Sequence, residues 1–184
     1  MNILLDKLPT EYKGLKIETN FRSFILFELL MQDNKVGQED KIALALKLFY
    51  KNIPSDIKIA FEGILWFYSR GEQKKHKTNE TTSKKERIYS YEHDANYIYS
   101  AFLSQYGIDL NEIDYLHWWK FKSLFEGLND ENKICQIMGY RAIDLSKIKD
   151  KEQKKKYKRL KMAYKLPDER TEEEKENDFA DAFW

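Results

Sequence analysis

Few residues in this sequence combine the types and the spacing that catalysis requires. Glu92, His93 and Asp94 are consecutive, so on a helix their side chains would point in different directions and would not converge on one ion or substrate. The sequence contains three histidines, and no two of them have the HxxxH or HExxH spacing of a helical metal site. We therefore expect no metal ion in this protein.

The single cysteine, Cys135, is the other candidate for chemistry, and one cysteine excludes an internal disulfide. A nucleophilic thiol needs an orienting base and an oxyanion site, and no histidine or second cysteine stands near Cys135 in the sequence. We predict a structural thiol. The sequence also lacks a GxGxxG fingerprint, a Walker-type loop and a GxSxG elbow. These absences predict a protein that is not an enzyme and that carries no cofactor.

The strongest charge feature is a basic segment at residues 147–165. It contains ten basic and two acidic residues, a local net charge of +8, whereas the whole chain has a net charge of +1. Such a density attracts phosphates, so nucleic-acid binding is one hypothesis. Few aromatic residues interleave with the basic ones, however, and the acidic segment 168–181 follows directly. We favour a solvated helix that docks through Tyr157, Leu160 and Tyr164 and whose charge is screened by that segment.

An aromatic stretch at residues 112–127 is predicted to be an amphipathic helix. At about 100° per residue, one stripe of this helix contains apolar residues and His117, which we interpret as a hydrogen-bonded core histidine. Tyr115 and Trp119 project from roughly the opposite side, with Trp118 between the two sets. Either both faces are internal, or the side with Tyr115, Trp118 and Trp119 contacts another protein, because Trp and Tyr are favoured interface anchors.

The end of the sequence offers a second candidate for partner binding. An acidic run is followed by FADAFW, in which Phe179 and Phe183 are four residues apart and Trp184 adjoins them. A short apolar peptide on an acidic tether resembles a ligand that binds in a groove as a helix. The alternative is that Phe179, Phe183 and Trp184 fold back onto the body of the same protein.

Helical periodicity dominates the remaining sequence and predicts an all-α fold, a multi-helix bundle. The first residues, 3–18, are interpreted as an extended entry segment with a possible short β-hairpin that turns near Lys13 and Gly14. Asn20 and Ser55 are expected to be helix caps. The predicted helices are 21–32, 39–50, a helix opened by Pro54 and Ser55 and ended by Gly71, 91–106, 112–127 with Asn111 as its cap, 131–139 and 150–165.

Composition divides the chain into four segments. Residues 72–87 contain no large apolar side chain, so they are predicted to be a polar flexible loop. This loop separates an N-terminal helical half, 1–71, from a C-terminal helical half, 88–167, and we expect the two halves to pack together. An acidic tail with an apolar terminus, 168–184, follows. No signal peptide and no apolar stretch of bilayer length are visible, so we expect a soluble intracellular protein without membrane contact.

Four motifs in the C-terminal half are similar to those of a known protein family. They are YSYEHDANYIYSAFLSQYGIDL (89–110), LHWWKFKSLFEGL (116–128), IMGYRAIDL (137–145) and YKRLKMAYKLP (157–167). In this order they resemble a family of tail-assembly proteins of long-tailed bacteriophages and prophages of Gram-positive bacteria. The N-terminal half resembles the family only in its helical content and in an LPTEY-type start.

The resemblance implies a bacteriophage tail assembly chaperone, encoded near the tape-measure protein, that coats this long helical protein while tail-tube subunits polymerise around it. The implied partners are the tape-measure protein, further copies of the chain and other tail assembly proteins, in the cytoplasm of the host bacterium. A coiled-coil tape measure offers long apolar stripes, which suits a helical protein with surplus apolar faces. The alternatives are a structural virion or tail component and a nucleic-acid-binding protein that uses the basic helix 147–165.

Overall fold

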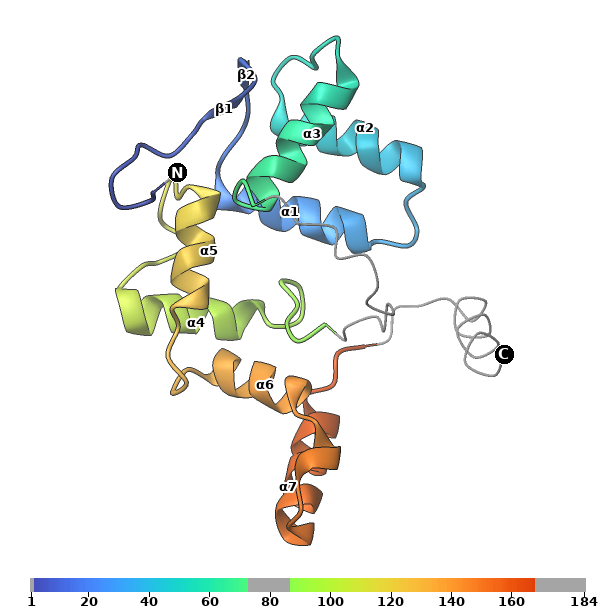
Figure 1. Ribbon diagram of the computed structural model, residues 1–184, viewed down its shortest axis with the longest axis vertical. Coiled ribbons are helices and arrows are strands. Elements are labelled where there is room, and N and C mark those ends of the chain that lie inside the picture. Colours follow the sequence, from blue (N-terminus) through green and yellow to red (C-terminus); the bar gives the residue numbers. More distant parts are fainter. Residues whose placement is uncertain (1, 73–86, 168–184) are drawn as a thin grey trace.

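The computed structural model describes residues 2–72 and 87–167, and over these ranges the fold is helical with one short hairpin (Figure 1). This confirms the predicted fold class. Most of the predicted loop 72–87 and the whole tail 168–184 lie outside the described residues. The elements are β1 (Glu11–Tyr12), β2 (Leu15–Lys16), α1 (Phe21–Gln32), α2 (Gln38–Phe49), α3 (Ile57–Tyr68), α4 (Ala95–Tyr106), α5 (Trp118–Glu126), α6 (Lys133–Ala142), a 3-10 helix η1 (Leu145–Lys147) and α7 (Lys151–Ala163).

The hairpin that the sequence predicted lies near the start of the chain. Strands β1 and β2 are antiparallel, with Tyr12 opposite Leu15, and the turn between them contains Lys13 and Gly14 at φ values of 48° and 81°. Left-handed backbone of this kind is easy for glycine and uncommon for other residues, so the turn lies where glycine permits it. The hairpin packs on α3, where the ring centroids of Tyr12 and Trp66 are 5.5 Å apart.

Helices α1, α2 and α3 form the upper part of the molecule in Figure 1. The predicted cap of α1 is confirmed, because the Asn20 side chain accepts a hydrogen bond from the Arg22 amide. Helix α3 is capped by Asp56, whose side chain accepts from the Ile59 amide. The expected cap, Ser55, is therefore corrected by one residue. Aspartate and serine are both preferred at this position, so the sequence did not separate them.

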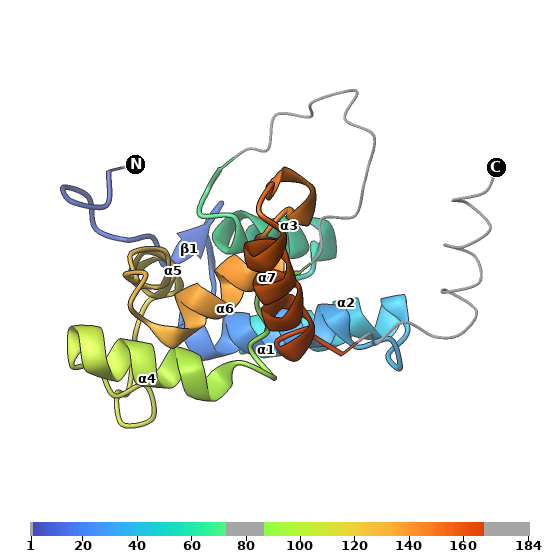
Figure 2. The ribbon, with the colours of Figure 1, turned by 90° about the horizontal axis from the view of Figure 1, so that it is seen from below.

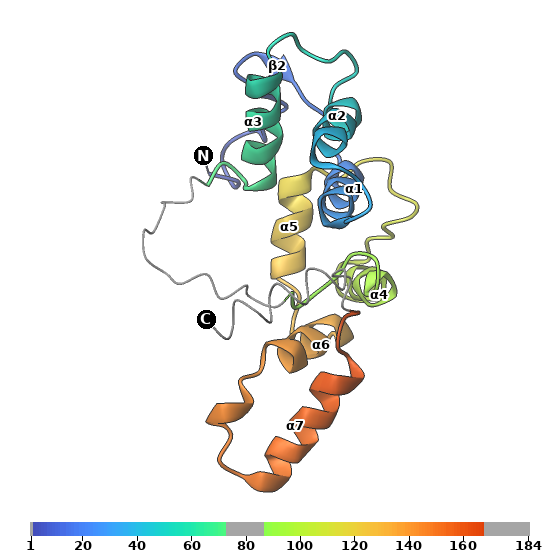
Figure 3. The ribbon, with the colours of Figure 1, turned by 90° about the vertical axis from the view of Figure 1, so that its right-hand side faces the viewer.

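Helix α5 lies at the centre of the fold and contacts α1, α3 and α4 (Figures 1 and 3). Phe24 of α1 stacks on Trp118 with centroids 5.1 Å apart, and Phe121 stacks on Phe102 of α4 at 5.0 Å. Trp118 and Phe121 also stack on each other, at 5.7 Å. The described residues on the two sides of the gap at 73–86 therefore share one core. The division of the chain at that loop stays a prediction.

The start of α5 corrects the predicted helix 112–127, because the helix begins only at Trp118. The residues just before it pair with the chain that precedes α1. The Phe21 amide donates to the Leu116 carbonyl at 2.9 Å, and the Trp118 amide donates to the Thr19 carbonyl at 2.8 Å. Backbone groups that form these two bonds are not available for the bonds of a helical turn. The first six residues of the predicted helix, 112–117, therefore form a loop and a β-bridge between His117 and Asn20.

Arg22 holds the loop before α5 in place. Its Nη2 donates to the carbonyls of Leu110 at 2.7 Å and Ile113 at 2.9 Å, which are 88 and 91 residues away in the sequence. The Asn20 side chain adds a bond from Nδ2 to the Asp114 carbonyl at 3.2 Å. The expectation that Asn111 caps a helix is therefore wrong, because the loop that contains it is a series of turns held by α1.

Helices α6 and α7, joined by η1, form an arm that projects from the rest of the fold (Figures 1 and 3). From below, α7 crosses in front of α6 (Figure 2). The predicted docking of α7 is confirmed for Tyr157 and Tyr164, whose rings lie 6.4 Å and 5.8 Å from the ring of Tyr140 on α6, whereas Leu160 is half-buried and borders an open depression. No residue of α7 is fully buried, so the helix rests on α6 by one partly covered face.

Candidate interaction surfaces

The two tryptophans at the start of α5 lie inside the protein. Trp118 is fully buried and Trp119 is 4% exposed. Both indole nitrogens donate to carbonyls at the end of α3, Trp118 Nε1 to Tyr68 at 3.2 Å and Trp119 Nε1 to Phe67 at 2.8 Å. These bonds satisfy donors that would be costly to bury unpaired, and they fix α5 against α3. The expected partner contact of this pair is corrected: both residues belong to the core, as the alternative interpretation held.

Tyr115 differs from the tryptophans because its side chain is 53% exposed. It lies in the loop before α5, and its hydroxyl shares a hydrogen bond of 2.7 Å with Oγ1 of Thr19. One end of the side chain is thus anchored while about half of the side chain remains open to solvent. Its contact with a partner stays a prediction. The other predicted binding residues, Phe179, Phe183 and Trp184, lie outside the described residues.

His117 is the hydrogen-bonded core histidine that the sequence predicted, and it is 3% exposed. Its Nδ1 accepts from the Trp119 amide at 3.1 Å, which makes it the N-cap of α5, and its Nε2 lies 2.9 Å from the Pro9 carbonyl oxygen. Because a carbonyl only accepts, Nε2 carries the proton and the ring is neutral. Burial lowers the pKa of His117, and the Pro9 carbonyl partly opposes this.

A buried ion pair joins the start of α4 to α6. Arg141 and Asp94 form a bidentate contact, with Nη1 2.5 Å from Oδ2 and Nη2 3.0 Å from Oδ1. Their side chains are only 8% and 2% exposed. The Asp94 carboxylate also accepts from the Ser90 amide at 2.9 Å. Charges buried to this degree are stable only when they are paired and hydrogen-bonded, and this pair meets both conditions.

Arg141 extends the same network to two backbone segments. Its Nη1 donates to the Ile88 carbonyl at 3.0 Å, and its Nε donates to the Tyr164 carbonyl at 2.6 Å. One guanidinium therefore connects the segment before α4, helix α6 and the end of α7. No local pattern predicts this network, because Asp94 and Arg141 are 47 residues apart in the sequence. The Asp94 carboxylate, considered above for chemistry, has a structural role.

Exposed apolar side chains on α3 form the clearest candidate for partner contact. Ile57, Phe61 and Leu65 recur every four residues and so lie on one face of the helix. Ile57 is 52% exposed and Leu65 is 46% exposed, with the half-buried Phe61 between them. We call these three residues the α3 stripe. A different face of the same helix, with Ile64 and Phe67, is fully buried in the core.

Exposed apolar residues on the other described helices do not recur at a spacing of three or four residues. Leu26 on α1 is 54% exposed, Leu44 on α2 is 43% exposed and Leu103 on α4 is 42% exposed. Single exposed apolar side chains are normal on protein surfaces. Three apolar side chains at helical spacing instead form a continuous surface against which another helix can pack. The α3 stripe is therefore the stronger candidate, and Leu103 is a suitable control position.

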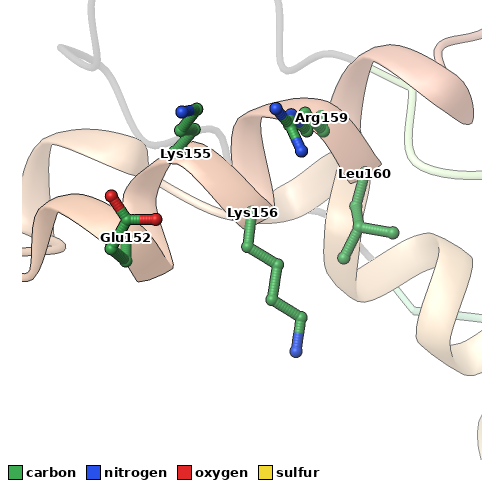
Figure 4. Close-up of a pocket in the computed structure, with 5 residues that line it drawn as sticks. All are labelled: Glu152, Lys155, Lys156, Arg159 and Leu160. Atoms are coloured by element: carbon green, nitrogen blue, oxygen red, sulfur yellow. The ribbon is translucent and has the colours of Figure 1, made fainter.

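Helix α7 presents a basic surface instead of an apolar one. Figure 4 shows Lys155 and Arg159 on one side of the helix and Lys156 and Leu160 on another. Together with Glu152 these residues line an open depression of about 290 Å³. This surface can attract anionic groups, but it is shallow and lacks the enclosure of a small-molecule site.

The candidate sites among the described residues are surfaces for binding another molecule. No side chain within these residues shows the features of a reactive group. The described part of the chain contains no cluster of His, Cys, Asp and Glu side chains that could hold a metal ion. Burial raises the pKa of the Cys135 thiol, which disfavours the reactive thiolate, and Sγ lies 3.6 Å from the Leu128 carbonyl oxygen. Within 2–72 and 87–167, no helix combines the length and apolar character needed to cross a membrane.

The chain was compared with models of known protein families, and one of them matches. The model of the family described as bacteriophage Gp15 protein matches residues 4–166. The chain belongs to this family. Because the match begins at residue 4, membership of the Gp15 family covers the hairpin and the first three helices as well as the C-terminal motifs. Membership supports a structural or assembly role in a bacteriophage. Comparisons with curated proteins and with solved structures give no match.

Proposed function

We propose that this Gp15 family member is a tail assembly chaperone that binds the tape-measure protein, and further copies of itself, in the cytoplasm of the host bacterium. The observation that carries the proposal is the α3 stripe, a line of exposed apolar side chains on a phage protein whose central tryptophans are already buried. A tape-measure protein is a long helical chain with apolar stripes of its own. Two such stripes pack by inserting the ridges of one helix into the grooves of the other.

The size of the α3 stripe suits reversible binding. From Ile57 to Leu65 the helix rises by about 12 Å. Covering roughly 200 Å² of apolar area at about 25 cal/mol per Å² contributes about 5 kcal/mol, before the cost of association. One copy therefore binds weakly, whereas many copies along one filament bind strongly together. This combination fits a protein that coats a filament during assembly and is then released.

Co-expression with the tape-measure protein tests the proposed function. The tape-measure protein has long apolar stripes, so we expect it to aggregate alone and to become soluble and co-purify with the wild-type chain. A tape-measure protein that stays insoluble, or that is soluble but does not co-purify, would contradict the chaperone function.

A double variant then tests the binding surface. Ile57→Ser combined with Leu65→Ser should reduce co-purification roughly tenfold, because the loss of two exposed apolar anchors costs about 1.4 kcal/mol or more. Leu103→Ser on α4 removes an apolar side chain of similar exposure, 42% against 46% for Leu65, and should bind like the wild type. Equal loss in both variants would show that the α3 stripe is not the contact.

A structural tail component is the second candidate function, because family membership supports structural as well as assembly roles. The two functions differ in the finished particle. Mass spectrometry of purified virions should detect tail-tube subunits but no peptide of a chaperone that has been released. Peptides of this chain at a fixed ratio to the tube subunits would favour the structural component.

A further inference from the structure

Helix α7 exposes one complete face to solvent. Lys155, Lys158, Arg159, Met162 and Ala163 are all exposed, and their spacing of three and four residues places them on the same side of the helix. They line an open depression of about 610 Å³. We call these five residues the α7 outer face. The opposite side of α7 is occupied by its contact with α6, so the outer face is the side available to another segment.

The α7 outer face carries concentrated positive charge. Residues 151–165 contain eight basic residues and one acidic residue, a net charge of +7. Within the described part of the chain, no carboxylate forms an ion pair with Lys155, Lys158 or Arg159. Lys155 and Arg159 stand on the same side of the helix (Figure 4), and like charges at this spacing destabilise a helix. An anionic occupant would relieve that repulsion.

The complementary charge follows directly in the same chain. Residues 168–184 contain eight acidic and two basic residues, a net charge of −6. The segment begins soon after α7 ends at Ala163. Pro167 stands between them, and proline disfavours a continuous helix through this point, so a reversal of chain direction is expected there. The charges of the two segments therefore nearly cancel if they meet.

We propose that residues 168–184 fold back and bind the α7 outer face of the same chain. Seventeen residues span at least about 25 Å, the length that they would have at the helical rise, whereas α7 with its 13 residues is about 20 Å long, so the segment is long enough to cover α7. In an antiparallel arrangement, Glu172 and Glu176 lie level with Arg159 and Lys155. These pairings place carboxylates opposite the cations that the described structure leaves without acidic partners.

The contact places the segment in competition with other anions for the basic arm. A tethered segment competes at an effective concentration in the millimolar range, so a separate anionic ligand must displace it before reaching α7. The acidic segment thereby limits unspecific capture of nucleic acid by a helix whose charge would otherwise attract phosphates. This inference is independent of the proposed tail assembly function, because it concerns two segments of one chain.

Carbodiimide cross-linking of the full chain tests the contact, because it joins only carboxylates and amines that are already adjacent. An equal mixture of unlabelled and heavy-nitrogen-labelled protein distinguishes links within one chain from links between two copies. We expect links from Lys155 and Lys158 to residues 172–176, within one isotope, in the monomer. Their yield should fall roughly fivefold at about 1 M salt, where the screening length is about 3 Å.

Charge reversal provides the controls. Lys155→Glu with Arg159→Glu should abolish the salt-sensitive links to the acidic segment, and adding Glu172→Lys with Glu176→Lys should restore them with the charges exchanged. Lys51→Glu, at an exposed lysine remote from α7 in the sequence, should leave the links unchanged.

Three results would overturn the proposal. Links spread evenly over exposed lysines, including Lys51, would show that the segment has no fixed site. Links of mixed isotope would identify a second copy as the occupant. Salt-sensitive retention of the wild-type chain by duplex DNA, without links between α7 and the segment, would identify nucleic acid instead.

Discussion

Replacing Asp94 with Asn should destabilise the protein by about 3–5 kcal/mol, because the substitution leaves the Arg141 guanidinium buried without a counter-charge. The two side chains are only 2% and 8% exposed, so water screens the charge little. The substitution removes the negative charge from contacts of 2.5 Å and 3.0 Å. The side-chain amide oxygen of the introduced asparagine can still accept a hydrogen bond from the Ser90 amide. The decrease in the free energy of unfolding therefore measures mainly the loss of the negative charge.

Urea unfolding followed by tryptophan fluorescence measures this loss, because Trp118 and Trp119 are buried in the folded protein. For a chain of this length each kcal/mol lowers the melting temperature by about 2–4 °C, so a decrease of about 6–20 °C is expected. Arg141→Met should cost at least as much, because the carbonyls of Ile88 and Tyr164 also lose a donor.

An exposed ion pair provides the matched control. Lys13 and Glu62 are 3.3 Å apart, with side chains 54% and 41% exposed. Exposed pairs contribute less than about 1 kcal/mol, so Glu62→Gln should shift the urea midpoint only slightly. If Asp94→Asn costs no more than Glu62→Gln, the buried pair does not hold α4 to α6.

Three further perturbations have defined outcomes. Arg22→Ala should cost about 2 kcal/mol in urea unfolding, because charge-assisted bonds to the loop before α5 are lost; an unchanged midpoint would contradict this. The pKa of His117 is lowered from its usual 6.5, so stability should be constant above about pH 7.5 and fall towards about pH 5.5, as the unfolded chain takes up a proton that the folded chain resists. This slope should vanish in His117→Gln. Gly63→Ala would place a methyl group 3.0 Å from Tyr50 Oη and 3.1 Å from Tyr12 Cδ1, so crowding of about 1–3 kcal/mol should outweigh a helix-propensity gain of about 1 kcal/mol and lower the melting temperature; a melting temperature above that of the wild type would show that the site has room.

Local signals in the sequence predicted most of the helices. Helix α1 was expected at 21–32 and is found at Phe21–Gln32, because an asparagine cap precedes an apolar run and no proline interrupts it. The last helix was expected at 150–165 and is found at Lys151–Ala163. In both cases the residues that decide the structure are neighbours in the sequence, so periodicity and capping were sufficient.

Contacts between distant residues explain the errors. Residues 112–117 have helical periodicity, yet they are held in turns and an extended bridge by Arg22 and by the chain before α1. Hydrogen bonds between segments 88 and 91 residues apart leave no periodic pattern in the sequence. The buried pair of Asp94 and Arg141 was missed for the same reason, since the two residues are 47 positions apart in the sequence.

The candidate binding site was harder to predict than the fold. Tryptophan is favoured both in cores and at interfaces, so the sequence left Trp118 and Trp119 with two interpretations that only their burial could separate. The α3 stripe had the opposite difficulty. Its spacing fits a buried helix face as well as an exposed one, and only the exposed fractions of Ile57 and Leu65, 52% and 46%, show that these residues face solvent.

Photo-cross-linking at the α3 stripe tests most directly whether this surface holds the tape-measure protein. A photoreactive amino acid is placed at position 65 or, as the control, at position 103, and each chain is co-expressed with the tape-measure protein and illuminated. We predict a covalent adduct of the two proteins from position 65 and none from position 103. An adduct from position 103 alone, or no adduct from either position, would contradict the assignment of the α3 stripe as the binding surface.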